Sequence, residues 1–214
     1  LIPKVFSDAF RLSMSPRRGP VCINLPRNIL ATSEKFKINE IKKSYEENIT
    51  LKSNNKLLKK VVNLINGSNK IVIIVGAGIK YNSKFKKVTR LAEYLNVPIV
   101  TAAGHGDAVP FDHKLHAGQM GPRGNPVASK LVKEADIIIA LGTRLGFNST
   151  FYSYENINKK AKIIQVELEK KMIGRYFPVE IGIYADAAIF ADQLYNEIKK
   201  TKFTTNLKEW TTRY

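Results

Sequence analysis

The feature that most constrains this sequence is an apolar run that ends abruptly in glycine and arginine. The run is ADIIIALGTR, Ala135 to Arg144, and Ile137 to Ile139 show no alternation of apolar and polar side chains. Strands that helices cover on both faces read as continuous apolar runs, whereas strands with one wet face alternate. The run therefore predicts a buried parallel strand. In open α/β sheets ligands bind just past the carboxyl ends of the strands, and glycine there allows close backbone approach while arginine offers donors for phosphate or carboxylate.

Length and composition restrict the class of protein. The chain has 214 residues, of which 44% are hydrophobic, and this suits one domain with flanking structure better than two domains. No apolar run approaches the roughly 20 residues that span a bilayer, so we expect no membrane partner. The chain begins at Leu1 without a signal-peptide pattern, and we expect the true amino terminus to lie upstream. The single cysteine, Cys22, lies in an apolar run and predicts an inert buried thiol and a cytoplasmic protein.

The net charge of +17 invites a nucleic-acid interpretation, which the distribution of the charges does not favour. The 35 Lys and Arg residues outnumber 18 Asp and Glu, but the lysines are scattered rather than clustered. Phosphate-binding grooves more often show clustered arginines interleaved with aromatic residues. We therefore expect a solvated lysine surface and no nucleic-acid partner.

The first quarter of the chain differs in pattern from the rest. Apolar residues at helical spacing predict a helix over Ile2 to Met14, and residues 15–19 then break it. A short apolar strand is expected over Pro20 to Leu25. From Asn28 to about Ser53 the sequence becomes polar and lysine-rich, which indicates a linker.

From Asn54 onward, helical faces and apolar strands alternate at the short spacing of a parallel sheet. Besides the strand within Ala135 to Arg144, apolar runs predict strands over 71–75, 97–101, 114–117, 162–166 and 179–184. Helices are expected over 57–65, 85–95, 126–135 and 187–198, with Asn125 as a cap and Asn96 as a stop. The fold class is thus α/β, a Rossmann-like six-stranded parallel sheet with helices on both faces. Residues 201–214 indicate a second linker or a tail.

Three loops rich in glycine or arginine follow strands of this sheet. They are Gly76 to Gly78, Gly118 to Gly124, and Gly142 to Arg144. A single such turn needs glycine for steric reasons alone, but three on one edge resemble a dinucleotide crevice with Arg123 and Arg144 as candidate phosphate clamps. The alternative for each arginine is a surface or interface ion pair.

Other polar residues give weaker signals. Glu167 ends a predicted strand and could accept hydrogen bonds from a ribose, or serve as a cap or a solvated acid. Three histidines (105, 113 and 116) and two aspartates (107 and 112) share one loop, but their spacing fixes no metal shell, so no metal site is expected. No residue pattern indicates a catalytic triad, a P-loop or paired carboxylates, and no catalytic residue is assigned.

Taken in order, these motifs resemble thiamine diphosphate-dependent enzymes of the acetolactate synthase and pyruvate oxidase type. RRGPVCINLPRNI at 17–29 resembles the end of their pyrimidine-binding domain. The successive parts of their central domain are resembled by IVIIVGAG at 71–78, LAEYLNVPIVTAAGHGDAVP at 91–110, HAGQMGPRGNPVA at 116–128, ADIIIALGTRL at 135–145 and KIIQVELEKKMIGR at 162–175. The resemblance implies the end of a pyrimidine-binding domain (1–30), a linker (31–53), a central domain (54–200) and a second linker (201–214).

In that family the central domain holds FAD in some members, ADP in others and nothing in the rest. The resemblance places the cofactor-binding positions at the ends of successive strands. They are Gly76 and Gly78, Gly118 and Gly121, Gly142 and Arg144, and Glu167.

Three departures from the flavin-binding pattern make flavin doubtful. Leu145, Gly146 and Phe147 stand where the flavin synthases have Phe-Asp-Asp, the usual Asp is Glu167, and a late Gly-Asp is replaced by Ala185-Asp186. The GTRLGFNST segment is closer to flavin-free relatives such as sulfoacetaldehyde acetyltransferase.

The resemblance also implies that the chemistry lies outside this chain. The glutamate that activates thiamine diphosphate and the Gly-Asp-Gly motif that holds its Mg²⁺ belong to the flanking domains of the family. The parent is then an acetolactate synthase-like carboligase or decarboxylase acting on a 2-oxo acid or similar substrate, a homodimer or homotetramer, and the fragment alone is expected to be inactive.

Two other interpretations remain. Gly76 to Ile79 also resembles the opening of the sirtuin deacylases, but those enzymes carry four zinc-binding cysteines and this chain has one. A non-catalytic nucleotide-binding or oligomerisation module is the third possibility.

Overall fold

The computed structural model describes residues 2–15, 18–33, 35, 51–80, 84–201, 203 and 207–212. The chain divides into two compact units, Leu1–Ile49 (unit 1) and Thr50–Tyr214 (unit 2). Most of the predicted linker, residues 36–50, lies outside the described residues. No helix in the described ranges is long and apolar enough to cross a bilayer.

Unit 1 contains the helices α1 (Ile2–Ser13) and α2 (Arg27–Leu30). The first confirms the predicted amino-terminal helix. The expected strand over Pro20 to Leu25 is wrong, because this segment has no strand partner among the described residues. The expectation of a buried Cys22 is also wrong, since the thiol is exposed. An apolar run becomes a buried strand only when a neighbour pairs with it and covers it, and the described part of unit 1 offers none.

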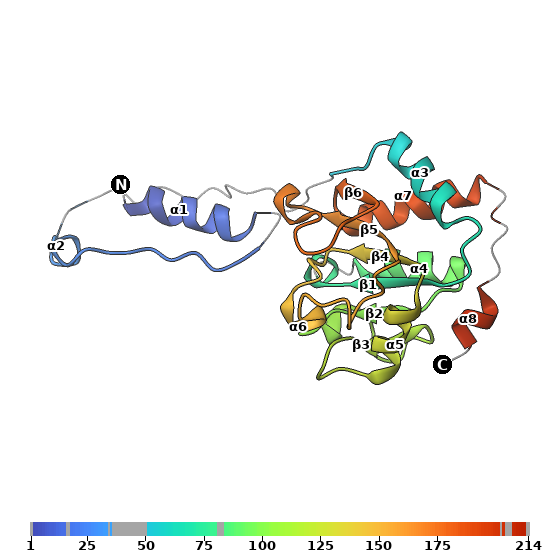
Figure 1. Ribbon diagram of the computed structural model, residues 1–214. Helices are drawn as coiled ribbons and strands as arrows, with labels where there is room; N and C mark the ends of the chain where they lie inside the picture. The colour runs from blue at the N-terminus through green and yellow to red at the C-terminus, as the bar shows by residue number, and fades with distance from the viewer. Residues whose placement is uncertain are drawn as a thin grey trace. The chain divides into compact units, whose positions relative to one another are not determined.

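Unit 2 is built on one six-stranded parallel sheet, in the order β3-β2-β1-β4-β5-β6 (Figure 1). The strands are β1 (Ile71–Val75), β2 (Ile99–Thr101), β3 (His116–Gln119), β4 (Ile137–Leu141), β5 (Lys162–Glu167) and β6 (Ile181–Tyr184). β1 and β4 are buried along their whole length, in register from Ile71 opposite Ile137 to Val75 opposite Leu141. The absence of alternation in the sequence therefore predicted the central strands correctly.

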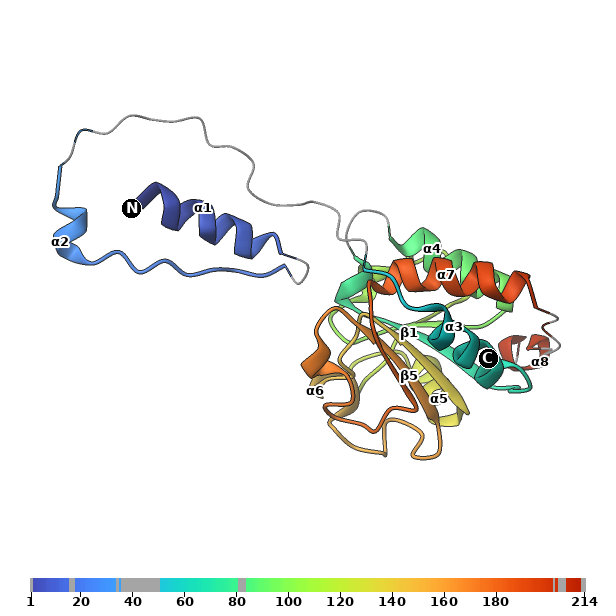
Figure 2. The same ribbon diagram turned by 90° about the horizontal axis from the view of Figure 1, so that it is seen from above.

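Helices cover both faces of the sheet (Figure 2). On one face α3 (Asn55–Ile65), α4 (Phe85–Leu95) and α7 (Ala187–Lys199) pack on alternate residues of β1 such as Ile71 and Ile73. On the other face α5 (Pro126–Glu134) packs on Val72 and Ile74. These layers confirm the predicted Rossmann-like α/β fold.

The helix ends follow the predicted capping residues. The side chain of Asn125 accepts a hydrogen bond from the Val127 amide, and Pro126 occupies the first turn of α5. Asn96 ends α4 in the left-handed conformation, with φ of 53°. Local sequence therefore determines where these helices begin and end.

One candidate glycine lies inside a strand rather than after it. The sequence places Gly118 in a loop, but the structure includes it in β3 with φ of +100°. Ile99 pairs with His116 and Thr101 with Gln119, so β3 carries one extra residue over this interval. Gly118 lies within this β-bulge at a positive φ, which glycine accepts without strain.

Unit 2 is larger at both ends than the sequence predicts. After residue 201, where a linker or tail is expected, α8 (Lys208–Thr212) packs against the core instead. Trp210 of α8 is buried, and its indole Nε1 donates to the carbonyl of Ile71 at 2.9 Å. At the other end Ser53, within the predicted first linker, exchanges two hydrogen bonds with the Gln193 side chain of α7.

Candidate functional site

The strand order reverses between β1 and β4, which makes their carboxyl ends the topological switch point of the sheet. From β1 the chain moves outward through β2 and β3, then returns to the other side of β1 and continues outward through β5 and β6. Ligands of open α/β sheets bind in the crevice at this point. The Gly76–Gly78 turn and the Gly142–Arg144 turn follow the two strands concerned.

The two turns are locked together by main-chain contacts. The Gly78 amide donates to the Gly142 carbonyl at 3.1 Å, and the Gly76 amide donates to the Leu141 carbonyl at 3.1 Å. A Cβ on Gly78 would lie 2.8 Å from the Gly142 Cα, and a Cβ on Gly76 would lie 2.6 Å from the Gly142 carbonyl oxygen. The close approach of the two turns, which we call the glycine crossing, therefore requires glycine at these positions whether or not a ligand binds.

Beyond the crossing, the chain is held so that Arg144 is exposed. Leu145 is buried and adopts the left-handed conformation with φ of 52°, which is uncommon for a branched residue. The preceding Thr143 accepts from the Leu145 amide at 3.3 Å, and its carbonyl accepts from the buried Gln165 side chain at 3.1 Å. Backbone strain of this kind is typical of functional loops.

A short helix, α6 (Phe147–Thr150), brings the loops after β2 and β3 to the same edge. The Ala103 amide, after β2, donates to the Ser149 hydroxyl at 2.9 Å. After β3, Gly121 packs so closely that a Cβ would lie 2.6 Å from the Asn148 carbonyl oxygen. Four loops thus converge at the carboxyl edge. Gly118 does not join them, because its α-carbon faces the capping residue Asn125.

A cationic cluster, which we define as Lys80, His105 and Arg144, lies beside the crossing. Lys80 follows η1 (Ala77–Ile79) and forms a 2.6 Å ion pair with Asp107 of η2 (Gly106–Ala108). Burial lowers the pKa of His105, the positive charge of Lys80 lowers it further, Asp107 opposes this, and Arg144 contributes in the lowering direction. The Lys80 hydrogen bond also lowers the pKa of Asp107. The Lys80–Asp107 ion pair and the exposed Arg144 therefore set the electrostatics around His105.

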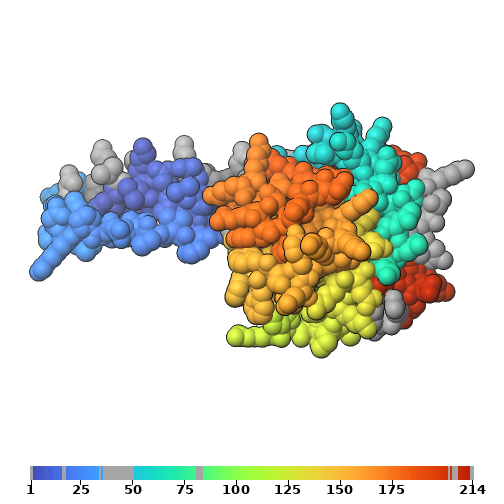
Figure 3. All heavy atoms as spheres, viewed as in Figure 1, coloured from blue at the N-terminus to red at the C-terminus, as the bar shows by residue number. Residues whose placement is uncertain are grey.

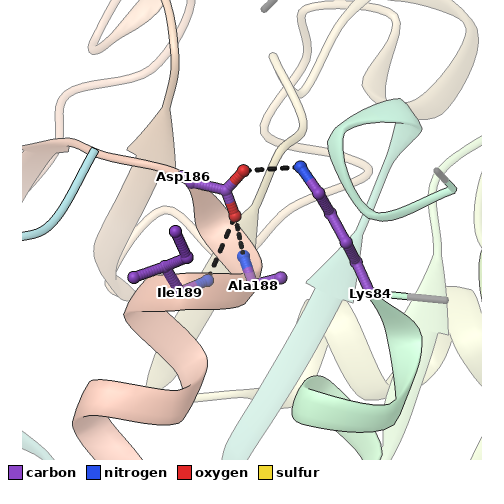
Figure 4. A network of polar contacts seen from close by, with 4 residues as sticks. All are labelled: Lys84, Asp186, Ala188 and Ile189. Carbon is purple, nitrogen blue, oxygen red and sulfur yellow. Dashed lines mark hydrogen bonds and ion pairs between the residues drawn. The ribbon is translucent and has the colours of Figure 1, made fainter. Parts of the chain in front are cut away.

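The two acidic candidates on the far side of the edge differ. Glu167 is the last residue of β5, pairs in register with Tyr184 and is half-buried. Asp186, which follows β6, is almost fully buried, and its carboxylate accepts from the amides of Ala188 and Ile189 in the first turn of α7. The other carboxylate oxygen lies 2.5 Å from Lys84 Nζ (Figure 4). Asp186 is therefore committed to holding α7 and α4.

We expect Asp186→Ala to lower the free energy of unfolding by about 1–3 kcal/mol, because it removes a helix cap and a half-buried ion pair. Lys84→Met removes only the ion pair and should cost less than about 1 kcal/mol. Urea denaturation of both variants and of the double variant measures their coupling. Lys86→Met, on an exposed side chain of the same helix, is the matched control. Equal losses in Asp186→Ala and the control would contradict this assignment.

No group of three or more His, Cys, Asp or Glu side chains is close enough to hold a metal ion among the residues that the structure describes. His105 belongs to the cationic cluster and Asp107 pairs with Lys80 of that cluster, whereas His113 approaches Glu93 at 3.4 Å.

Sequence reasoning missed Lys80, Lys84 and the aromatic residues around α6. The two lysines give no signal in a chain with so many scattered lysines, because only the fold shows which lysines face acids. The aromatic residues after Arg144 were a usable signal, since Phe147, Phe151 and Tyr152 follow it within eight positions.

The comparison with known families agrees with this architecture. Residues 58–194 match the family described as the central domain of thiamine pyrophosphate enzymes. The chain belongs to that family. This confirms the resemblance drawn from the strand-end motifs.

Curated relatives of this thiamine pyrophosphate enzyme domain include acetolactate synthases and sulfoacetaldehyde acetyltransferases. The acetolactate synthase large subunit of Buchnera aphidicola subsp. Schizaphis graminum is 30% identical over 98% of this chain, and the probable acetolactate synthase large subunit of Methanococcus aeolicus is 25% identical over 98%. The chain spans 37% of the length of each of these relatives. The sulfoacetaldehyde acetyltransferase of Roseovarius nubinhibens is 38% identical over 61% of this chain and 22% of its own length.

Proposed function

We propose that the chain is the central domain of a thiamine diphosphate-dependent carboligase or decarboxylase of the acetolactate synthase type, acting on a 2-oxo acid or similar substrate. The observation that carries the proposal is the locked glycine crossing at the switch point, with Arg144 exposed beside it, in a domain that matches this family. In such an enzyme thiamine diphosphate, with Mg²⁺, supplies the carbanion chemistry. This domain supplies a rigid surface at the carboxyl edge of its sheet. The complete enzyme is proposed to assemble as a homodimer or homotetramer.

The residues at this edge fit a phosphorylated ligand. Arg144 presents positive charge where the strands end, near the ion pair of Lys80 with Asp107, and Glu167 stands where a ribose could donate to it. The position equivalent to the late Gly-Asp fits less well, because the Asp186 carboxylate is already used by α7 and Lys84. We therefore propose a nucleoside diphosphate such as ADP at this edge ahead of FAD.

A second candidate parent is a flavin-free enzyme related to sulfoacetaldehyde acetyltransferase. Its support is the 38% identity to the Roseovarius nubinhibens protein over 132 residues, higher than the identity to either acetolactate synthase relative given above. Both candidates place the same domain in a thiamine diphosphate enzyme, but they differ in substrate.

Assay of the protein translated from the complete gene separates the two candidates. With thiamine diphosphate and Mg²⁺, the first candidate releases carbon dioxide from pyruvate, and the second consumes sulfoacetaldehyde. The 214-residue chain alone should show neither activity. Turnover by that chain would contradict the placement of the chemistry in other domains, and failure of the complete protein on both substrates would contradict the proposed class.

Arg144→Ala should weaken the binding of ADP to the chain by about 1–3 kcal/mol, since a charged hydrogen bond to phosphate is lost. Isothermal titration calorimetry measures this change. Arg90→Ala is the matched control, because Arg90 lies on α4 and pairs with Asp192, away from the strand ends. An unchanged affinity in Arg144→Ala would place Arg144 outside the site.

A further inference from the structure

A pocket lies where β5 and β6 begin, at the edge of the sheet opposite the glycine crossing, and we call it the amino-edge pocket. Its volume is about 230 Å³. One wall is the chain that leads into β5, residues 154 and 158–163, and the other is the segment that leads into β6, residues 177–180. The stretch from α6 to β6, to which both walls belong, forms much of one face of unit 2, in amber and orange in Figure 3.

Hydrogen bonds hold the two walls of the amino-edge pocket in place. The Glu180 amide donates to the Ile163 carbonyl at 2.9 Å and so joins one wall to the other. The Asn158 side chain donates to the Ala135 carbonyl at 2.9 Å, and it accepts from the Lys160 amide at 2.9 Å. The loop before β5 is thereby tied to the end of α5. A pocket with walls fixed in advance loses little conformational freedom when it binds a ligand.

Part of the lining is apolar and includes two buried side chains. Phe177 and Ile163 are each 3% exposed. The ring of the half-exposed Tyr154 meets Phe177 edge to face, with centroids 5.5 Å apart and planes inclined by 76°. Pro178 and Val179 extend the same wall. An apolar group of a ligand in this pocket is therefore removed from water against apolar and aromatic surface.

The charged side chains of the lining are mostly positive. Lys159, Lys160 and Lys162 line the pocket together with one acid, Glu180. In the part of the chain that the structure describes, none of the three lysines forms an ion pair with an acidic side chain. Lys159 Nζ lies 5.9 Å from the centroid of the Tyr154 ring, which places one of these charges beside the aromatic wall. An anion in the pocket therefore meets more positive than negative charge.

The size of the pocket limits the class of ligand. Pockets for drug-sized ligands have volumes of about 300–1,000 Å³, and the amino-edge pocket, at about 230 Å³, is smaller. A single water molecule takes up about 30 Å³ of the liquid, so the space equals that of several waters. It suits a small organic molecule rather than a nucleotide.

We propose that the amino-edge pocket binds a small organic monocarboxylate with an apolar body. The carboxylate faces the three pocket lysines, and the apolar body lies against Tyr154 and Phe177. This inference is independent of the proposed function, because the pocket and the glycine crossing lie at opposite ends of the strands. Either site can fail its test without the other.

Three probes separate the charge of the ligand from its apolar body. Phenylacetate has both, phenylacetamide keeps the ring without the charge, and acetate keeps the charge without the ring. Nuclear magnetic resonance titrations of the ¹⁵N-labelled 214-residue chain give each affinity and identify the amides whose signals move. We expect phenylacetate to bind about fivefold more tightly than phenylacetamide and about tenfold more tightly than acetate. The signals that move should come from residues 158–163 and 177–180.

A triple variant with glutamine in place of each pocket lysine tests the part of the charges. It should bind phenylacetate about fivefold more weakly than the wild-type chain and bind phenylacetamide equally well. The matched control changes the net charge by the same amount on exposed positions of α3 that do not line the pocket: Lys56→Gln, Lys59→Gln and Lys60→Gln. Circular dichroism of both triple variants confirms that they are folded.

Glu180→Gln gives a change in the opposite direction. It removes the one acid of the lining, so it should strengthen phenylacetate binding by about twofold. Weaker binding in this variant would overturn the recognition of an anion.

The other outcomes are equally decisive. Equal affinities for phenylacetate and phenylacetamide, or equal losses in the two triple variants, would overturn the role of the lysines. Equal affinities for phenylacetate and acetate would overturn the apolar body. No saturable binding, signals that move only elsewhere, or a glutamate-rich peptide that binds here and is not displaced by phenylacetate would overturn the small-molecule site. None of these results bears on ADP at the carboxyl edge.

Discussion

Gly142→Ala is expected to lower the free energy of unfolding by about 2–5 kcal/mol. Gly142 has φ of +60°, a conformation that costs any other residue energy, and a Cβ there would lie 2.7 Å from the Gly78 Cα. The opposing atom is main chain and cannot rotate away, so the two turns would have to separate. Urea denaturation followed by circular dichroism measures the loss, which is a large part of the stability of a typical domain.

Two other glycines separate the causes of this loss. Gly67→Ala has the same kind of backbone, with φ of +94°, but nothing within 4 Å of the new Cβ, so it should cost only the conformational part, about 1–2 kcal/mol. Gly146→Ala has open space and no positive φ, and it should cost less than about 1 kcal/mol. If Gly142→Ala cost no more than Gly67→Ala, the close crossing of the two turns would be wrong.

Trp210→Ala should destabilise unit 2 by about 3–5 kcal/mol, the usual cost of removing a buried tryptophan. The side chain is 4% exposed, packs in the same cluster as α5 and donates to the Ile71 carbonyl. Trp210→Phe retains a ring but leaves that carbonyl without the indole donor, so it should cost roughly 1–3 kcal/mol.

The matched control for Trp210 is Phe111→Ala, since Phe111 is 92% exposed. It should change the free energy of unfolding by less than about 0.5 kcal/mol. A Trp210→Ala variant as stable as this control would show that residues 207–212 are a detached tail, as the sequence first suggested.

The sequence predicts the sheet and its helices well because their signals are local. The unbroken run at Ile137 and the capping residues Asn96 and Asn125 each act within a few positions, and the structure places them as expected. The six parallel strands and the family were therefore accessible from the sequence alone.

The failures share a cause, which is that burial depends on distant partners. The apolar run around Cys22 looks like a strand but has no neighbour to pair with among the described residues. The polar segment around Trp210 looks like a linker but contacts the start of β1. Gly118 was misplaced because the bulge depends on the register with β2. No local pattern reports any of these contacts.

The candidate site was predicted in part. Gly76, Gly78 and Gly142 lie together as expected, but their closeness to one another explains them before a ligand does. The roles of Gly121, Arg144 and Glu167 toward a cofactor stay predictions.

The first and last described segments of unit 2 are held at opposite ends of the strands. Leu51, near its start, accepts a hydrogen bond from the Asp186 amide just past the carboxyl end of β6, whereas Trp210, near its end, is bonded to the first residue of β1. The chain thus enters at the edge that carries the candidate site and finishes at the opposite edge. Leu51 therefore lies next to the carboxyl ends of the strands, whereas Trp210 is separated from them by the length of β1.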